Sequence, residues 1–306
     1  MKGINKHILT ALAYFDMFNY PLNRVELFLF LQERYDHQEF DDALKYMVAN
    51  QYVFSFGAFY TLKNEPRLMI KRLEGNRKAA DLIKIAHKVG NILIRVPYVK
   101  GIAISGSLSK NYADDNSDID LFIITAKNRL WIARTLMHCV KKLSFLFNKQ
   151  HYFCMNYYVD ESQLEIVEQN IYTAIEVTTL MPLHGESIFE QFFAENHWTQ
   201  KYLPNNNLRL SVAKPVKNGI GKRFFEALFN NKLGDAIDKS LMNITASRWD
   251  KKTVQKRLNM HGVLLNMCAG RHCSKPNPIE FQQKLLKRYE EKVEKTLHVQ
   301  ENSIAY

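Results

Sequence analysis

The sequence predicts an α+β protein in three parts: an N-terminal module of helices and a hairpin over residues 1–64, a central α/β core with a small mixed sheet over 65–165, and a helical C-terminal domain over 166–306. A chain of 306 residues has room for two or three domains. Its 46% hydrophobic and 24% charged residues are typical of a folded globular protein and exclude a disordered or fibrous one. Along the chain, apolar spacing is first helical, then alternates between strand and helix, and then is helical again.

The N-terminal module is predicted to contain three short helices and a hairpin. Apolar residues recur at helical spacing over 8–17, 25–31 and 40–48. Two short runs rich in aromatic residues, 52–56 and 59–62, flank a Gly-Ala pair and predict two strands joined by a tight turn. This order resembles a winged helix, a module whose last helix commonly enters the major groove of DNA.

The third helix of this module carries little positive charge. Glu39, Asp41 and Asp42 outnumber Lys45, and the run 52–62 contains no arginine or lysine. Because phosphate contacts dominate the affinity of proteins for DNA, we expect this module to pack or to contact protein, with DNA binding as the alternative.

A long basic amphipathic helix is predicted from Pro66 to Ile94, since proline suits a first helical turn and Pro97 stops the helix. The residues expected to face the core are Met69, Ile70, Leu73, Ala80, Ile83, Val89 and Leu93. The basic residues expected to stay in solvent are Arg67, Lys71, Arg72, Arg77, Lys78, Lys84 and Lys88.

The central core should alternate strands and helices. Strands are predicted over 98–105, 118–125 and 151–159, with a helix over 128–147. After Leu164 the apolar spacing is helical almost to the end.

The residues that indicate chemistry lie between Gly101 and Thr125. An apolar strand leads into Gly106-Ser107, and ten residues later Asp118-Ile119-Asp120 opens the next apolar strand. Carboxylates at positions i and i+2 of a strand point to the same face, roughly 7 Å apart along the backbone. They can therefore share divalent cations, while the intervening isoleucine faces the core.

Mg²⁺ prefers oxygen ligands and is commonly bound through one or two carboxylates together with substrate phosphates. Gly106 lets the backbone approach a phosphate closely, and Ser107 offers an amide and a hydroxyl. Lys110 adds a positive charge nearby. Such a site would hold a nucleoside triphosphate with its α-phosphate presented to a hydroxyl, and two metals would stabilise the attacking and leaving oxygens.

At these residues the sequence resembles the nucleotidyltransferases of the DNA polymerase beta superfamily. Their pattern is an apolar residue, Gly, Gly or Ser, about nine to thirteen residues, then Asp, apolar, Asp or Glu, and it is complete here over 97–160. The resemblance implies that Asp118 and Asp120 bind Mg²⁺, with Mn²⁺ as an alternative ion. It also implies that Gly106 and Ser107 hold a triphosphate such as that of ATP, and that transfer to a hydroxyl releases pyrophosphate. The acceptor is RNA, a nucleotide, a protein or a small molecule.

The family usually supplies a third carboxylate from the next core strand, and this sequence departs from that pattern. Alternation along 151–160 puts Tyr158, Asn156 and Asp160 on the face expected to meet the site. Asn156 would serve as a neutral ligand and catalytic residue at mid-strand, and Asp160 as a metal ligand at the strand end. Glu176, on the following helix, is a third option.

The net charge of +11 suggests an anionic partner such as a nucleotide or nucleic acid. Basic residues also concentrate in the C-terminal part, where they include Lys217, Lys222, Arg223, Arg248, Lys251, Lys252, Lys256, Arg257, Arg271 and Lys275. Four scattered cysteines and the lack of a leader-like N-terminus favour a cytoplasmic location. No stretch of about 20 apolar residues occurs, so we expect no membrane partner.

Other catalytic motifs are excluded. Ser107-Leu108 stands where a P-loop requires Lys followed by Ser or Thr, and Ser105 lacks the flanking glycines of a nucleophile elbow. The alternative to an enzyme is a regulatory or DNA-binding protein that keeps the transferase fold without catalysis. The missing third acid favours that alternative.

Overall fold

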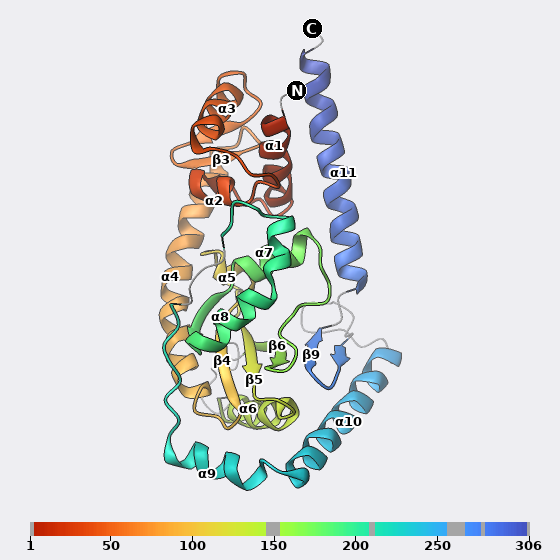
Figure 1. Cartoon of the computed structure of the whole chain (residues 1–306). Helices are drawn as coiled ribbons and strands as arrows, with labels where there is room; N and C mark the ends of the chain where they lie inside the picture. The colour runs from red at the N-terminus through yellow and green to blue at the C-terminus, as the bar shows by residue number, and fades with distance from the viewer. Residues whose placement is uncertain (1–2, 145–153, 208–211, 256–266, 277–278, 305–306) are drawn as a thin grey trace.

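The structure, a computed structural model, shows the mixed α+β fold that the sequence predicts. The parts of the chain that it describes are residues 3–144, 154–207, 212–255, 267–276 and 279–304. In Figure 1 a six-stranded sheet lies below the N-terminal module, and two long helices, labelled α4 and α11, run along opposite sides of the molecule.

The N-terminal module contains the three helices and the hairpin expected, with a two-residue strand that the sequence did not indicate. Its elements are α1 (Gly3–Asp16), β1 (Leu22–Asn23), α2 (Arg24–Leu29), α3 (His37–Ala49), β2 (Phe54–Phe56) and β3 (Phe59–Thr61). The three strands form an antiparallel sheet in the order β1-β3-β2. Gly57 adopts a φ of +60° in the hairpin turn, a conformation that favours glycine.

Helix α4 (Arg67–Leu93) occupies the range predicted, but its inward face differs from the expected one. Ile70, Leu73 and Ala80 are exposed, whereas Arg72 is buried. In its first turns α4 contacts the N-terminal module through Arg72. Its later turns bury Ala86, Val89 and other small or apolar residues against the sheet.

Arg72 connects α4 to the N-terminal module. Its guanidinium donates hydrogen bonds to the carbonyl of Pro21 (2.8 Å), to Glu26 Oε1 (2.6 Å) and to Asn76 Oδ1 (2.8 Å). It also lies 3.8 Å from the ring centre of Tyr20, which is a cation–π contact. One arginine therefore holds two parts of the chain together.

The central sheet has the order β7-β4-β5-β6-β9-β8. Its strands are β4 (Val99–Ile104), β5 (Asp120–Thr125), β6 (Cys154–Asp160), β7 (Met181–His184), β8 (Met267–Ala269) and β9 (Cys273–Pro276). Strands β5 and β6 are parallel and all other neighbours are antiparallel, so the sheet is mixed as expected.

The expectation of a purely helical C-terminal domain is wrong, because β7, β8 and β9 belong to the central sheet. These strands have three or four residues each, too few to show a period of two. The remaining elements are helical: α5 (Gly106–Ser109), α6 (Leu130–Ser144), α7 (Ile171–Thr178), α8 (Glu186–Glu195), a 3₁₀ helix (His197–Lys201), α9 (Ile220–Phe229), α10 (Lys232–Val254) and α11 (Ile279–Ile304).

The sheet separates two hydrophobic cores. On one face, Phe122, Ile124 and Val159 pack with α7 and α8, and this core continues into the N-terminal module and α11. On the other face, Leu121 and Ile123 pack with α4 and α6. The N-terminal module and the sheet thus share one continuous core.

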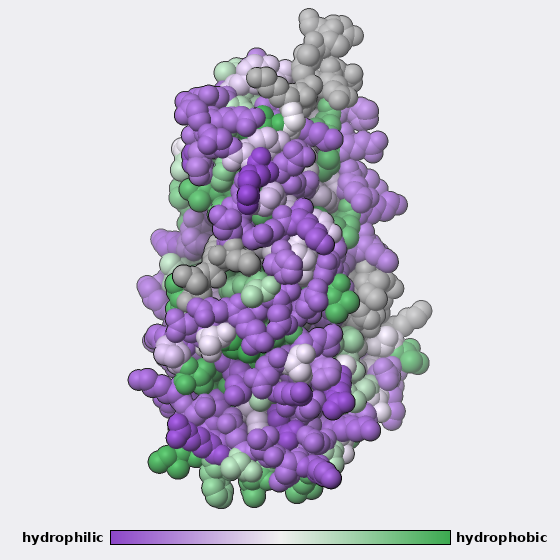
Figure 2. Space-filling view, in the orientation of Figure 1, coloured by the Kyte–Doolittle hydropathy of each residue, from purple (hydrophilic) through white to green (hydrophobic). Residues whose placement is uncertain are grey.

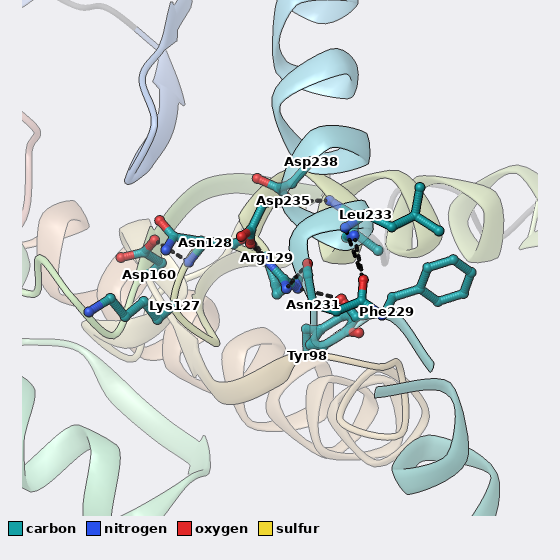
Figure 3. Close-up of polar contacts among 12 residues, drawn as sticks. Tyr98, Lys127, Asn128, Arg129, Asp160, Phe229, Asn231, Leu233, Asp235 and Asp238 are labelled. Carbon is teal, nitrogen blue, oxygen red and sulfur yellow. Dashed lines mark hydrogen bonds and ion pairs between the residues drawn. The ribbon is translucent and has the colours of Figure 1, made fainter. Parts of the chain in front are cut away.

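Helix α10 is attached to the start of α6 by two acidic side chains. Asp238 Oδ1 accepts a hydrogen bond from the Ile132 amide (2.9 Å), and Asp235 pairs with Arg129 (2.5 Å). Figure 3 shows these groups together with Asn231 and the Phe229 carbonyl, which Arg129 also contacts. Burial raises the pKa of Asp238 to about 6, although the hydrogen bonds from the α6 backbone act in the opposite direction.

Asp238→Asn is expected to stabilise the protein above pH 6. The unfolded carboxyl has a pKa near 3.8, so burying the charged form costs free energy above about pH 6, and this cost fades as the pH falls towards 4. The variant keeps an acceptor for the Ile132 amide. Urea unfolding should show a gain of up to about 3 kcal/mol at pH 8 that shrinks at pH 4.5.

The control for this measurement is Asp250→Asn, which changes an exposed carboxylate on the same helix. Its stability difference from the wild type should not depend on pH. If Asp238→Asn instead loses the same amount of stability at both pH values, the charged carboxylate is the better hydrogen-bond acceptor for the Ile132 amide.

Within the described ranges, no helix combines the length and apolar character needed to cross a membrane. The face in Figure 2 is mostly hydrophilic, and hydrophobic side chains gather at the end where Figure 1 places α9. Ile220, Phe224 and Leu228 of that helix are exposed.

Candidate active site

The bend between β4 and α5 lies directly against Asp120. Gly106 has a φ of +67°, and the Ser105 amide donates to the Asp120 carbonyl (2.9 Å), which extends the pairing of β4 with β5. A Cβ atom on Gly106 would lie 2.8 Å from Asp120 Oδ2, closer than such atoms come in proteins. The backbone conformation therefore favours glycine, and the carboxylate beside it leaves no room for a Cβ atom.

Asp118 lies just before β5, because the strand begins at Asp120. The expectation that both carboxylates are held within one strand is therefore corrected. Asp118 is half-buried, and Ile119 between the two acids is fully buried in the core, as predicted.

Ser107 is exposed on α5, and its carbonyl accepts hydrogen bonds from the amides of Lys110 and Tyr112. This short helix is held from several sides. Gly75 of α4 leaves space for the ring of Tyr112, since a Cβ there would lie 2.4 Å from the ring. The Tyr20 hydroxyl of the N-terminal module donates to the Lys110 carbonyl.

Lys110 already has a hydrogen-bond acceptor and an ion-pair partner within the protein. Its Nζ donates to the Gly106 carbonyl (3.0 Å) and pairs with Glu176 Oε1 of α7 (2.8 Å). The ammonium group lies beside the bend, as expected, but a negative charge of the chain already faces it. A triphosphate would have to compete with Glu176 for this lysine.

A cavity of about 260 Å³ opens between the sheet and α7 and begins at the bend. Its polar lining includes Ser105, Gly106, Asp120 and Glu176, and also the ion pair of Lys275 with Glu168. The other lining residues are Phe122, Tyr157, Ile166, Tyr172, Thr173, Val177, Leu180 and Gln282. Most of the wall is apolar and aromatic.

Tyr172 is a neutral hydrogen-bond donor in this wall. Burial, and then the negative charges of Glu176 and Asp120, raise the pKa of its phenol far above the ordinary value. The phenol therefore keeps its proton at any physiological pH. Tyr172 lines the cavity together with both acids.

Strand β6 does not present the face that the sequence predicted. The pairing with β5 shifts at Asn156, so that Met155 lies opposite Leu121 and Tyr157 opposite Phe122. This bulge reverses the alternation, and Tyr157, rather than Tyr158, shares the cavity with Asp120. The side chain of Asn156 lies outside the described residues, although its backbone belongs to β6.

The structure does not bring Asp160 to the bend. Asp160 pairs with Thr125, at the end of β5 opposite to Asp120. Five steps along a strand separate the two ends by roughly 16 Å. As a metal ligand beside Asp120, Asp160 is therefore a wrong prediction.

Asp160 instead holds the turn before α6. Its buried carboxylate accepts hydrogen bonds from the Asn128 amide (3.0 Å) and from the amide (3.0 Å) and hydroxyl (2.6 Å) of Ser162. His272 Nδ1 lies 2.9 Å away. Figure 3 shows Asp160 beside Asn128, near the contacts of Arg129.

Of the two acids considered for the third position, Glu176 lines the cavity with Asp120, whereas Asp160 does not. Glu176 comes from α7, which packs on the same sheet face. Among the described residues, no three His, Cys, Asp or Glu side chains form a group that could hold a metal ion.

The sequence did not identify Tyr157, Glu168 or Tyr172 as parts of this cavity. Lys275 entered only as one of many basic residues, yet it is buried and paired with Glu168. These side chains come from elements far apart in the chain, and no local pattern connects them.

Searches against protein-family models, curated proteins and solved structures give no significant match to this chain.

Proposed function

We propose that the protein is a Mg²⁺-dependent nucleotidyltransferase, which moves a nucleoside monophosphate from a triphosphate to a hydroxyl acceptor and releases pyrophosphate. The observation that carries this proposal is the contact between the left-handed Gly106 bend and the carboxylate of Asp120. Because the bend has no Cβ atom, a phosphate can approach its backbone amides closely. The carboxylate beside the bend can bind a cation that also contacts this phosphate.

In this proposal Gly106 and Ser107 bind the triphosphate, because the bend leaves Ser107 exposed. Asp118 and Asp120 would hold Mg²⁺, which would neutralise charge on the phosphates. Asp120 also borders the cavity, so a hydroxyl group bound there lies close to the same carboxylate. The aromatic walls exclude water from this end of the site and favour an acceptor with an apolar body.

Lys110 and Glu176 position the parts of the site. Their ion pair joins the end of α5 to α7, and Glu176 lines the cavity. When a triphosphate binds, the ammonium group can turn from the Glu176 carboxylate to a phosphate oxygen. That exchange frees Glu176 to act as the third acid.

The test is an assay with each of the four nucleoside triphosphates, labelled at the α-phosphate, together with Mg²⁺ and a cell extract as the source of acceptors. We expect a labelled product and pyrophosphate with at least one triphosphate, and no product when EDTA is present. The absence of both transfer and nucleotide binding with all four triphosphates would contradict the proposal.

A second candidate function is a regulatory protein with an inactive transferase fold. The observation that favours it is the Lys110–Glu176 pair, which neutralises the carboxylate of Glu176 that lines the cavity together with Asp120. DNA binding by the N-terminal module is less well supported, since Glu39 is exposed on α3 and Asp41 forms an ion pair with Arg24 (2.6 Å). A duplex DNA gel shift that survives Asp118→Ala/Asp120→Ala, in a protein without transferase activity, would favour this function.

A further inference from the structure

A second cavity, of about 330 Å³, lies where the end of α1 meets α11, and it shares no lining residue with the candidate active site. Figure 1 shows these two helices side by side, although almost the whole chain separates them in sequence. The cavity is lined by Asp16, Met17, Asn19, Lys63, Arg288, Glu291, Lys292 and Lys295.

Asp16 lies beneath two of the lysines. Its side chain is 1% exposed, with Lys63 Nζ 3.3 Å from Oδ1 and Lys292 Nζ 2.6 Å from Oδ2. Lys63 also donates to Asn19 Oδ1 (2.7 Å). A buried carboxylate needs such partners. Here the carboxylate of Asp16 holds two ammonium groups at the wall of the cavity. Both lysine side chains remain one-third exposed, so it is their positive ends that the cavity presents.

Helix α11 adds more positive charge than Asp16 can balance. Arg288, Lys292 and Lys295 are spaced i, i+4 and i+7 and share one helix face, an arrangement in which like charges repel. Arg288 and Lys295 form no hydrogen bond or ion pair with any other residue that the structure describes. The second acid of the cavity, Glu291, lies 4.0 Å from Lys287.

We propose that this cavity binds a phosphate group. Four cations face two carboxylates, so the site has an excess of two positive charges, which matches a phosphate dianion. The guanidinium of Arg288 can bind two phosphate oxygens at once, and the lysines add donors from the other sides. The volume is within the range of small-ligand sites. A phosphate here would join α11 to the N-terminal module.

The phosphate can belong to a small phosphorylated molecule or to a nucleic-acid backbone, and titrations of the full chain with inorganic phosphate, pyrophosphate and a 20-nucleotide DNA strand distinguish these sources. All titrations are done without Mg²⁺, so that the carboxylates of Asp118 and Asp120 repel the anionic probes and the candidate active site contributes little. We expect pyrophosphate or the oligonucleotide to bind, and binding of the oligonucleotide alone would identify nucleic acid as the source.

Arg288→Gln/Lys295→Gln should weaken this binding at least about tenfold, because the removal of each charge-assisted hydrogen bond takes away a large part of the affinity. Both residues are exposed, so the variant should fold normally. The matched control, Lys251→Gln/Lys252→Gln, removes two exposed charges from α10 and should bind as before. Binding that is equal in both double variants, or no binding of any of the three probes, would overturn the proposal.

Discussion

Asp120→Asn is expected to lower nucleotide transfer at least about 100-fold while the protein stays folded. The substitution keeps the size of the side chain against Gly106, so the bend itself need not move. It removes the negative charge that would hold Mg²⁺ next to the triphosphate, and the loss of one preorganised charged group at a reacting centre typically costs about 10²–10³-fold in rate.

The measurement is the rate of pyrophosphate release at saturating triphosphate, for the wild type and the variant. Asp115→Asn is the matched control, since Asp115 lies in the loop before β5, is exposed and pairs with Lys78 at the surface. It should retain the wild-type rate. Equal rates for Asp120→Asn and Asp115→Asn would show that Asp120 takes no part in the reaction.

Arg72→Met is expected to lower the free energy of unfolding by about 3–5 kcal/mol. Methionine keeps much of the volume of the side chain, which is 2% exposed as arginine. It leaves the Pro21 carbonyl without this donor, and it deprives Glu26 Oε1 of its cation. Breaking a buried ion pair from one side is costly because the remaining charge no longer has its partner.

Chemical denaturation of the two proteins measures this difference. Arg67→Met is the control on the same helix, because Arg67 is 81% exposed and its ion pair is with Glu65. Its cost should stay within about 0.5 kcal/mol. A similarly small cost for Arg72→Met would show that the N-terminal module does not depend on this arginine for its attachment to α4.

Helices and strands in which apolar residues recur at a regular spacing could be predicted from the sequence. The range of α4, the hairpin around Gly57 and the strands on both sides of Gly106 follow from apolar spacing and turn residues. The closeness of Gly106 to Asp120 was expected only because the resemblance places the small-residue bend and the acids in one site, and the antiparallel pairing of β4 with β5 brings them together.

Features that depend on long-range packing could not be predicted. In the sequence Arg72 cannot be told from the other basic residues of the same helix, which lie in solvent. Only the fold brings Pro21 and Glu26 to it. The bulge at Asn156 reverses the face of β6 without any glycine to indicate it. Glu176 reaches the cavity because of the way α7 packs on the sheet, which the helical period of its own segment does not reveal.

The most direct test of the account is a structure of the protein with a non-hydrolysable nucleoside triphosphate and Mg²⁺. We expect the phosphates to lie over Gly106 and Ser107, with the metal between them and the carboxylates of Asp118 and Asp120. The Lys110–Glu176 ion pair should be open in that complex. A nucleotide bound elsewhere, with the bend and the ion pair unchanged, would contradict the assignment of this site.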